Sequence, residues 1–435
     1  MTKLWSKKGL KLNPAVNAYM ISKNLEQDTI LLPYDIQAST AHAKMLGKVG
    51  LLKKAESEKL VKTLEEILKR IQQGLFKLKQ EDEDCHTTIE NYLVEKLGET
   101  GKKIHMGRSR NDQVLVAMRL YTKDYLIKTK KSVLEMAKTI LSFAKKYEFV
   151  PMPGYTHTQQ AMPSSVGQWA GSFVESLLDD CDAIAAAINM VDCNPLGSAA
   201  GFGTALPIDR DYTTKLLGFS RTQINSIYCQ NSRGKMESFV LAALLQVMMS
   251  LGKIANDLVW FTSQEFNFFN IAPEFTTGSS IMPQKRNLDI MEVLRANVSV
   301  IFANQTQVQS AGHNLLSGYN KDLKITKKAL MDSFDITLSS MDITDLLFKN
   351  ITPNKERLSK SMTPGIFATD EANRLAVSGI PFRDAYKKVG ESISNVKTQN
   401  AEKNIRSKKH IGATGNLSLD VYEKMIKNKS LTKKA

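Results

Sequence analysis

The chain of 435 residues lacks the local motifs of several common enzyme classes. It has no Walker A loop for nucleotide phosphates, no H-E-x-x-H zinc motif, no G-x-S-x-G nucleophile elbow and no EF-hand calcium loop. Gly197, Gly201 and Gly203 do not form a dinucleotide fingerprint, because no strand is expected before them. We therefore expect an enzyme that works without a metal or a nucleotide cofactor.

Cysteine is scarce, and the sequence has no C-x-x-C pair. Its four cysteines are scattered, which argues against a zinc ribbon and against a disulfide framework. The acidic run 81–86 contains residue types that bind metals, but acids before a helix that starts near Thr87 more often stabilise the positive end of that helix. We expect reduced structural thiols and no metal site.

Long apolar runs are also missing. Residues 1–13 carry four lysines and no continuous apolar stretch, so they do not resemble a secretory signal. The most apolar segment, 239–251, is too short to span a bilayer. These observations predict a cytoplasmic protein without a membrane partner.

The net charge of +15 favours an anionic partner of some kind, which includes nucleic acid, an anionic membrane or an anionic small substrate. Much of the excess lies in residues 3–11 and 405–435, so a solvated basic surface is the alternative reading. Composition alone does not choose between these partners.

Apolar residues at three- and four-residue spacing predict long amphipathic helices. The clearest of them covers residues 112–146, and the same spacing predicts helices at 166–190, 235–263, 289–309 and 326–347. Helices of this length are typical of an extended bundle. Because β-branched alternation is scarce and no Asn-Gly or Asp-Gly turn separates apolar runs, the fold is expected to be mainly α.

A pair of shorter helices is expected near the carboxyl end. Thr369 can cap the first, Gly379 can end it, and Pro381 can begin a second that runs to Ile393. A helix-turn-helix that binds DNA is an alternative interpretation of this pair. However, the second helix mixes acidic with basic residues and lacks a basic reading face, so we expect a small domain and no nucleic-acid partner.

Two polar loops in the first half of the chain carry candidate chemistry. Residues 105–113 include Arg108, Ser109 and Arg110 followed by Asn111, and guanidinium groups bind carboxylates or phosphates bidentately. Asn111 or Asp112 could instead only cap the next helix. Residues 154–163 place His157 among hydroxyls and amides, where it could transfer protons, although a lone histidine in a loop is more often structural.

Two further loops follow in the second half. In residues 278–287 a Gly-Ser-Ser segment precedes Lys285, which could stabilise an oxyanion, and Asn287, which could donate a hydrogen bond. Residues 318–324 add a phenol and more positive charge. Either acyl transfer from a serine nucleophile or proton abstraction beside a carboxylate could use such a set.

At these residues the sequence resembles the argininosuccinate lyase family, within the fumarase and aspartase superfamily that also includes δ-crystallins. Gly-Ser-Ser-x-Met-Pro-x-Lys-x-Asn at 278–287 marks the superfamily, while Arg-Ser-Arg-Asn-Asp-Gln at 108–113 and Tyr-Asn-Lys-Asp-Leu at 319–323 point to the family. The other matching segments are 34–36 with 41–43, Glu81-Asp82 with His86 and Glu90, 154–163, 194–207 and 381–383.

The resemblance implies a β-elimination that splits argininosuccinate into L-arginine and fumarate without a cofactor, in arginine biosynthesis. A proton leaves the carbon next to a carboxylate, and the resulting aci-carboxylate must be held by fixed cations and amides. In the family pattern Ser279 is the base, His157 lies with the general acid, Lys285 and Asn287 hold the intermediate, and Glu292 positions the lysine.

The same resemblance implies the substrate contacts and the assembly. Substrate-binding positions carried over are Ser109, Arg110, Asn111, Thr156, Tyr319, Lys324, Lys327 and His86. It also implies three domains, 1–107, 108–354 and 355–435, with the central helical bundle forming the core of a homotetramer. Each active site is then built from three subunits.

The sequence departs from the family pattern at several positions. Lys324 stands where glutamine is usual, next to the arginine end of the substrate, where a cation repels the guanidinium unless an acid compensates. Trp5-Ser6-Lys7-Lys8 replaces Trp-Gly-Gly-Arg, Leu288 replaces a common proline, and the pattern around Ser22 is blurred, so Ser22 stays unassigned. The alternatives are a sister lyase that releases fumarate from adenylosuccinate, aspartate or malate, and a non-catalytic crystallin-like protein.

Overall fold

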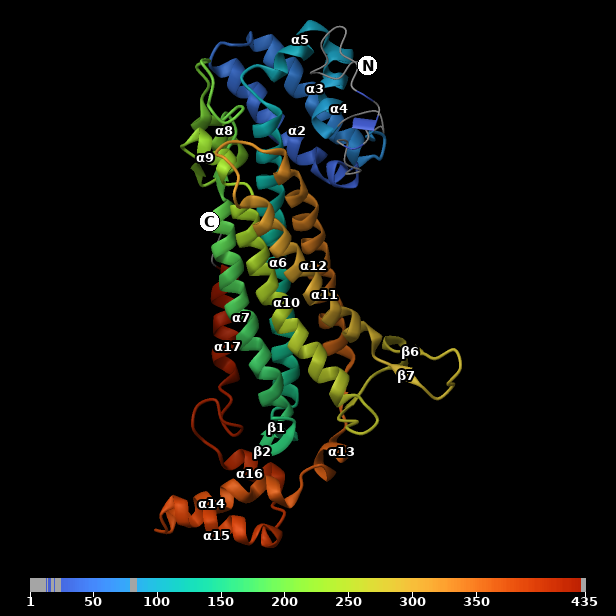
Figure 1. Ribbon diagram of the computed structural model, residues 1–435, viewed down its shortest axis with the longest axis vertical. Coiled ribbons are helices and arrows are strands. Elements are labelled where there is room, and N and C mark those ends of the chain that lie inside the picture. The colour runs from blue at the N-terminus through green and yellow to red at the C-terminus, as the bar shows by residue number, and fades with distance from the viewer. Residues whose placement is uncertain (1–12, 14, 17–18, 20–24, 79–83, 432–435) are drawn as a thin grey trace.

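The computed structural model describes residues 13, 15, 16, 19, 25–78 and 84–431. Ser22 and the acids 81–83 of the acidic run lie outside these described residues. Figure 1 shows a long bundle with a group of helices at each end.

Five long helices form the bundle, as the apolar spacing predicts. They are α6 (Arg110–Lys146), α7 (Val166–Val191), α10 (Lys235–Phe261), α11 (Asp289–Gly312) and α12 (Thr326–Asn350). Their bounds lie within a few residues of the expected ones. The prediction of a mainly α fold is confirmed.

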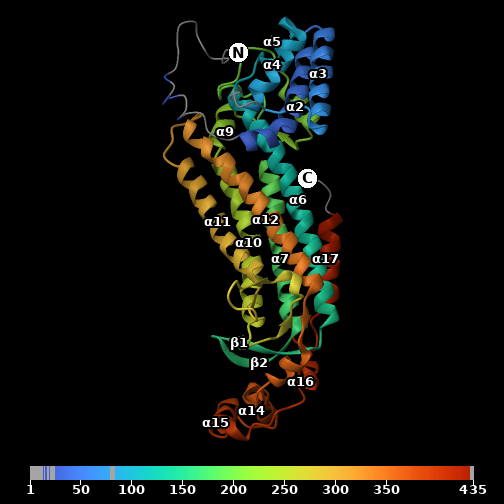
Figure 2. The same cartoon turned by 90° about the vertical axis from the view of Figure 1, so that its right-hand side faces the viewer.

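Shorter helices cover the two ends of the bundle (Figures 1 and 2). At the upper end lie α2 (Leu25–Lys48), α3 (Lys54–Gln72), α4 (Cys85–Leu97), α5 (Glu99–Lys102), α8 (Arg210–Leu217) and α9 (Ser226–Asn231). At the lower end lie α13 (Lys355–Lys360), α14 (Ala368–Val377), α15 (Phe382–Glu391) and α16 (Ala401–Ser407). The last helix, α17 (Leu419–Leu431), returns along the bundle and packs against α6 and α7.

The strands are short and pair two by two. They are β1 (Pro151–Thr156) with β2 (Gln159–Ser165), β3 (Cys193–Asn194) with β4 (Arg221–Thr222), β5 (Phe269–Asn270) with β8 (Thr352–Pro353), and β6 (Thr277–Gly278) with β7 (Arg286–Asn287). Short 3-10 helices complete the described elements: η1 (Lys103–His105), η2 (Pro273–Phe275), η3 (Lys321–Ile325), η4 (Pro364–Phe367) and η5 (Ile393–Asn395).

Aromatic side chains fill the lower part of the bundle core. The rings of Trp169 and Phe269 lie 5.1 Å apart between centroids, and those of Phe143 and Phe348 lie 5.3 Å apart. Each such apolar side chain contributes about 1.5–3 kcal/mol when it leaves water. The core therefore fixes the ends of the helices from which the polar loops emerge.

Helix α10 belongs to an apolar segment that is longer than residues 239–251, the most apolar segment of the sequence. Residues 226–261, which include α9 and α10, are long and apolar enough to cross a membrane, although the sequence predicts a segment too short to do so. However, 61% of their most apolar window is buried inside the molecule, which is the behaviour of a core helix.

The carboxyl-terminal helix pair and the cysteines can be compared directly with the predictions. The first helix of the carboxyl-terminal pair begins at Ala368, so Thr369 lies inside it and does not cap it. Gly379 follows the C-cap of this helix, Ser378, and has φ 102°. The four cysteines are free and buried, as expected for structural thiols.

Candidate active site

A cavity of about 250 Å³ lies at the upper end of the bundle, where α6 and α10 begin and where η3 leads into α12. Five of the predicted substrate-binding residues line it: Arg110, Asn111, Tyr319, Lys324 and Lys327. Five charged residues without a predicted role in binding join them: Asp28, Asp84, Arg233, Glu237 and Lys321. The cavity therefore combines cations with carboxylates.

The start of α6 holds the first of these residues in place. Ser109 is the N-cap, and its hydroxyl accepts a hydrogen bond from the backbone N–H of Asn111 at 3.3 Å. Asp112 completes the capping box by accepting from the N–H of Ser109 at 2.8 Å. Of the expected capping residues, Asp112 is confirmed, while Asn111 instead faces the cavity.

The second carboxylate oxygen of Asp112 holds a neighbouring loop. It accepts hydrogen bonds from the N–H groups of Gly197 and Ala199, both at 3.0 Å. Gly197 has φ 86°, and a Cβ there would lie 2.9 Å from side-chain atoms of Arg210 and Ile208. Only glycine fits this turn, so the loop is fixed beside Asn111.

Arg110 lies against a fixed acid. Its Nε is 3.1 Å from Oδ2 of Asp84, and it donates a hydrogen bond to the hydroxyl of Thr87 at 2.9 Å. Asp84 is the N-cap of α4. Burial would raise the pKa of Asp84, but the charges of His86 and Arg110 outweigh burial and hold that pKa below its usual value. Arg110 is therefore oriented before any ligand arrives.

Arg233 connects two of the polar loops, and sequence reasoning did not identify it. Its guanidinium donates to the backbone carbonyl oxygen of Asn111 at 2.5 Å, and it lies 5.2 Å from the ring centroid of Tyr319. Burial lowers the pKa of Arg233, and the charge of Glu237 opposes that effect. No motif marked it, because it lies in the turn before α10.

Acidic side chains offset this positive charge from two other helices. Asp28 on α2 binds Lys327 at 2.8 Å, and both side chains are largely buried. Glu237 lies in the first turn of α10 and is 8% exposed. The sequence signal that could have identified Glu237 is its position among apolar residues such as Met236 and Val240. Charged residues are rarely buried without a reason.

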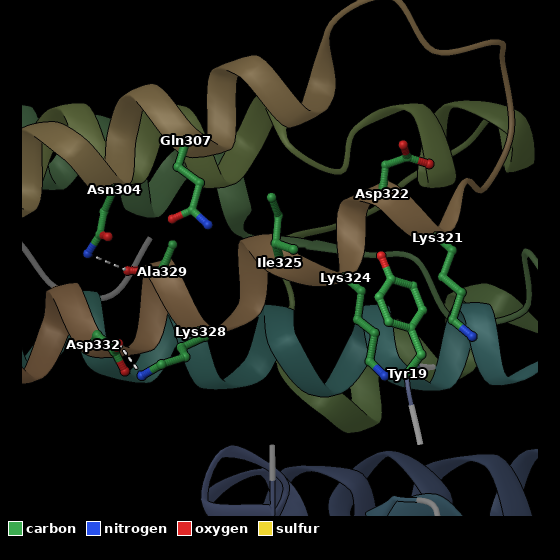
Figure 3. A pocket seen from close by; sticks show the side chains of 10 residues that line it. All are labelled: Tyr19, Asn304, Gln307, Lys321, Asp322, Lys324, Ile325, Lys328, Ala329 and Asp332. Atoms are coloured by element: carbon green, nitrogen blue, oxygen red, sulfur yellow. Dashed lines mark hydrogen bonds and ion pairs between the residues drawn. The ribbon is translucent and has the colours of Figure 1, made fainter. Parts of the chain in front are cut away.

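Lys324 also borders a second, larger cavity, of about 720 Å³, which is lined mainly by residues of α11, η3 and α12. Figure 3 shows Lys321 and Lys324 extending toward the same side as Tyr19, while Lys328 binds Asp332 at 2.5 Å. The positive charge at the position where glutamine is usual therefore lies between the two cavities.

The predicted catalytic loop lies elsewhere. Its ends pair as β6 and β7, and the ribbon projects from the lower half of the bundle (Figure 1). The hydroxyl of Ser279 accepts hydrogen bonds from the N–H groups of Ile281 and Met282, at 3.3 and 3.1 Å. Lys285 and Glu292 are exposed to solvent, and Asn287 pairs with Thr277.

The histidine loop is a β-hairpin rather than an irregular loop. Thr156 pairs with Gln159, so His157 and Thr158 form a two-residue turn, with φ 53° and 63°. Two-residue turns of this hand normally use Gly or Asn. Because both are absent here, no hairpin was predicted at this position. Thr156 and His157 are exposed at the lower end of the bundle.

His86 does not line the cavity. It is buried, and its Nδ1 lies 2.8 Å from Oδ2 of Asp35. Burial lowers the pKa of His86, but the charge of Asp35 outweighs burial and holds the pKa well above its usual value. With Cys85 these two residues place three ligand atoms within 4.8 Å, the one such group that we find in the described part of the chain. Within this group His86 and Asp35 form a buried pair.

One chain therefore assembles only part of the predicted site. Arg110, Asn111, Tyr319, Lys324 and Lys327 share the upper cavity, and Ser109 caps the helix beside it. Except for His86 in α4, the remaining predicted residues lie toward the other end of the bundle, in the hairpin β1–β2, the ribbon β6–β7 and the first turn of α11 (Figures 1 and 2). They are Thr156, His157, Ser279, Lys285, Asn287 and Glu292.

Comparisons with known proteins agree with these features. The family model described as "Lyase" matches residues 14–303. The argininosuccinate lyase of Thermotoga neapolitana is 41% identical over 91% of this chain and 99% of its own length, and that of Sorangium cellulosum is 43% identical over 96% of this chain and 97% of its own.

Solved structures share the fold at lower identity. EDDS lyase in complex with formate matches with a TM-score of 0.81 and 20% identity, over 94% of this chain and 91% of its own. A fumarate lyase/δ-crystallin from Brucella melitensis bound to cobalt matches with a TM-score of 0.73 and 17% identity, over 97% of this chain and 93% of its own. The chain belongs to the argininosuccinate lyase family of the fumarase and aspartase superfamily.

Proposed function

We propose that this chain is an enzyme that cleaves argininosuccinate reversibly into L-arginine and fumarate, as a step of arginine biosynthesis. The observation that carries the proposal is the upper cavity, where Arg110, Asn111, Tyr319, Lys324 and Lys327 meet beside three carboxylates. A substrate with carboxylates at both ends and a guanidinium between them requires both signs of charge. Relatives named argininosuccinate lyase match over nearly the whole chain.

The proposed mechanism starts with proton removal by Ser279 from the carbon next to a substrate carboxylate. Lys285 and Asn287 then hold the doubly charged aci-carboxylate, and the guanidino nitrogen leaves as it takes a proton from the acid group that His157 serves. Glu292, in the first turn of α11, positions Lys285. The positive φ of His157 supports its role, because strained backbone clusters at functional sites.

We further propose that the enzyme is a cytoplasmic homotetramer whose active sites are each built from three subunits. Ser279 and His157 are far from the upper cavity of their own chain (Figure 1). Helices α10 and α11 expose large apolar side chains, including Trp260 at 57% and Phe302 at 62%. Burying such a face against other copies would complete both the packing and the site. Size-exclusion chromatography with light scattering tests the assembly.

An ultraviolet assay for fumarate tests the activity. Purified protein should produce fumarate from argininosuccinate, without added metal or nucleotide, and much more slowly from adenylosuccinate, aspartate or malate. The Ser279→Ala variant should lose nearly all of this activity and keep the wild-type melting temperature. Turnover of one of the other substrates alone would assign the chain to a sister lyase, and no turnover of any of them would favour a structural role.

A further inference from the structure

Glu237 differs from the other carboxylates of the upper cavity. Asp28 is paired with Lys327 and Asp84 with Arg110, at 2.8 and 3.1 Å. The Oε2 atom of Glu237 is buried and has no hydrogen-bond partner among the described residues. It is the cavity carboxylate with an unsatisfied oxygen.

An unsatisfied carboxylate oxygen is costly inside a protein. Buried charges are normally paired or hydrogen-bonded, because the loss of water is otherwise not compensated. The position of Glu237 in the first turn of α10 gives it favourable contact with the helix dipole, but provides no partner for Oε2. Because the residue also lines the cavity, a cationic group of a ligand there can offset the charge of the Glu237 carboxylate.

We infer that Glu237 binds a positively charged group of the substrate's arginyl half and so helps determine specificity. The inference rests on the proposed function and adds to it a residue and a charge. Lys324 lines the same cavity and would repel such a group. The carboxylate of Glu237 offsets that repulsion, so Glu237 and Lys324 act as a pair in substrate choice.

The Glu237→Gln variant tests this inference, because it removes the charge and keeps the shape. We expect the KM for argininosuccinate to rise about tenfold or more, as for a lost hydrogen bond between charged groups, while kcat changes much less. Glu135→Gln, at an exposed position of α6, is the matched control and should leave KM unchanged. A purely structural role of Glu237 would lower the melting temperature and leave KM unchanged, and that result would overturn the inference.

The second variant tests the pairing. If Glu237 offsets the charge of Lys324, then Lys324→Gln should recover part of the affinity that Glu237→Gln loses. Independent effects of the two substitutions on KM would contradict the compensation.

Calorimetric binding of arginine analogues separates this inference from the proposed function and identifies the group. L-arginine should bind the wild type more tightly than Glu237→Gln. Nα-acetyl-L-arginine lacks the ammonium charge. If its binding is weakened by Glu237→Gln as much as that of arginine, the guanidinium is the group that Glu237 binds. If its binding is equal in the two proteins, the ammonium is that group. Equal binding of arginine to both proteins would overturn the inference even in an active enzyme, whereas a wild type that binds arginine but forms no fumarate would refute only the proposed function.

Discussion

The guanidinium of Arg233 donates a hydrogen bond to the backbone carbonyl oxygen of Asn111, at 2.5 Å and across 122 residues of chain. The same group lies over the ring of Tyr319. One side chain thus joins the start of α6, the start of α10 and the segment before α12. The shape of the upper cavity depends on this connection.

Replacing Arg233 by methionine should therefore loosen the cavity. The variant loses a charge-assisted hydrogen bond and a cation–π contact, together about 2–3 kcal/mol. We expect a lower melting temperature and a KM for argininosuccinate raised about tenfold. Steady-state kinetics and thermal unfolding measure the two effects. Arg374→Met, which removes an exposed ion pair with Glu371, should change neither. An unchanged KM in Arg233→Met would show that the cavity does not need this link.

Asp112→Asn should disturb the first turn of α6 and the loop at Gly197 together. The carboxylate accepts three backbone hydrogen bonds with its two oxygens, and asparagine offers only one acceptor oxygen. We expect a loss of about 2–3 kcal/mol in the free energy of unfolding, measured in urea, and a lower kcat/KM because Asn111 moves. Asp420→Asn, at an exposed position of α17, is the control. If stability fell while kcat/KM stayed at the wild-type value, the loop would not position Asn111.

A buried acid predicts how stability depends on pH. Burial raises the pKa of Asp180 to about 6, against the hydrogen bond from Ser250. Since the folded pKa exceeds the unfolded one, the group's contribution is fully present below about pH 4 and is lost as pH rises through about 6. Asp180→Asn should therefore raise the melting temperature at pH 8 and have little effect at pH 4. The opposite pattern would show that the carboxylate is stabilised in its charged form.

The sequence could predict the bundle because its signal is periodic. Apolar residues such as Leu126 and Val133, seven residues apart, recur on one face of α6, and both are fully buried. The hairpin at His157 was missed because its turn lacks glycine and asparagine, and the tertiary structure holds it in a conformation that local sequence does not favour.

The candidate site was predictable only where a motif marked it. The residues of the motifs at 108–113 and 319–323 meet in one cavity, as expected of a binding site. Arg233 and Glu237 belong to no motif, and their role comes from the geometry that places α10 between the two loops. The pairing of His86 was not predictable for a related reason, because its partner Asp35 lies 51 residues away and sequence spacing could not reveal the pair.

The separation of Ser279 from Asn111 within one chain leads to a prediction about mixed assemblies. If each site takes these residues from different subunits, Ser279→Ala and Asn111→Ala should each be nearly inactive, and co-expression of the two should restore activity. With random mixing, about one site in four receives both intact residues, so activity should recover to about a quarter of the wild-type value. Two affinity tags isolate the hybrids, and each variant mixed with itself is the control. If both residues came from the same chain, every site would carry one lesion and the hybrids would stay inactive.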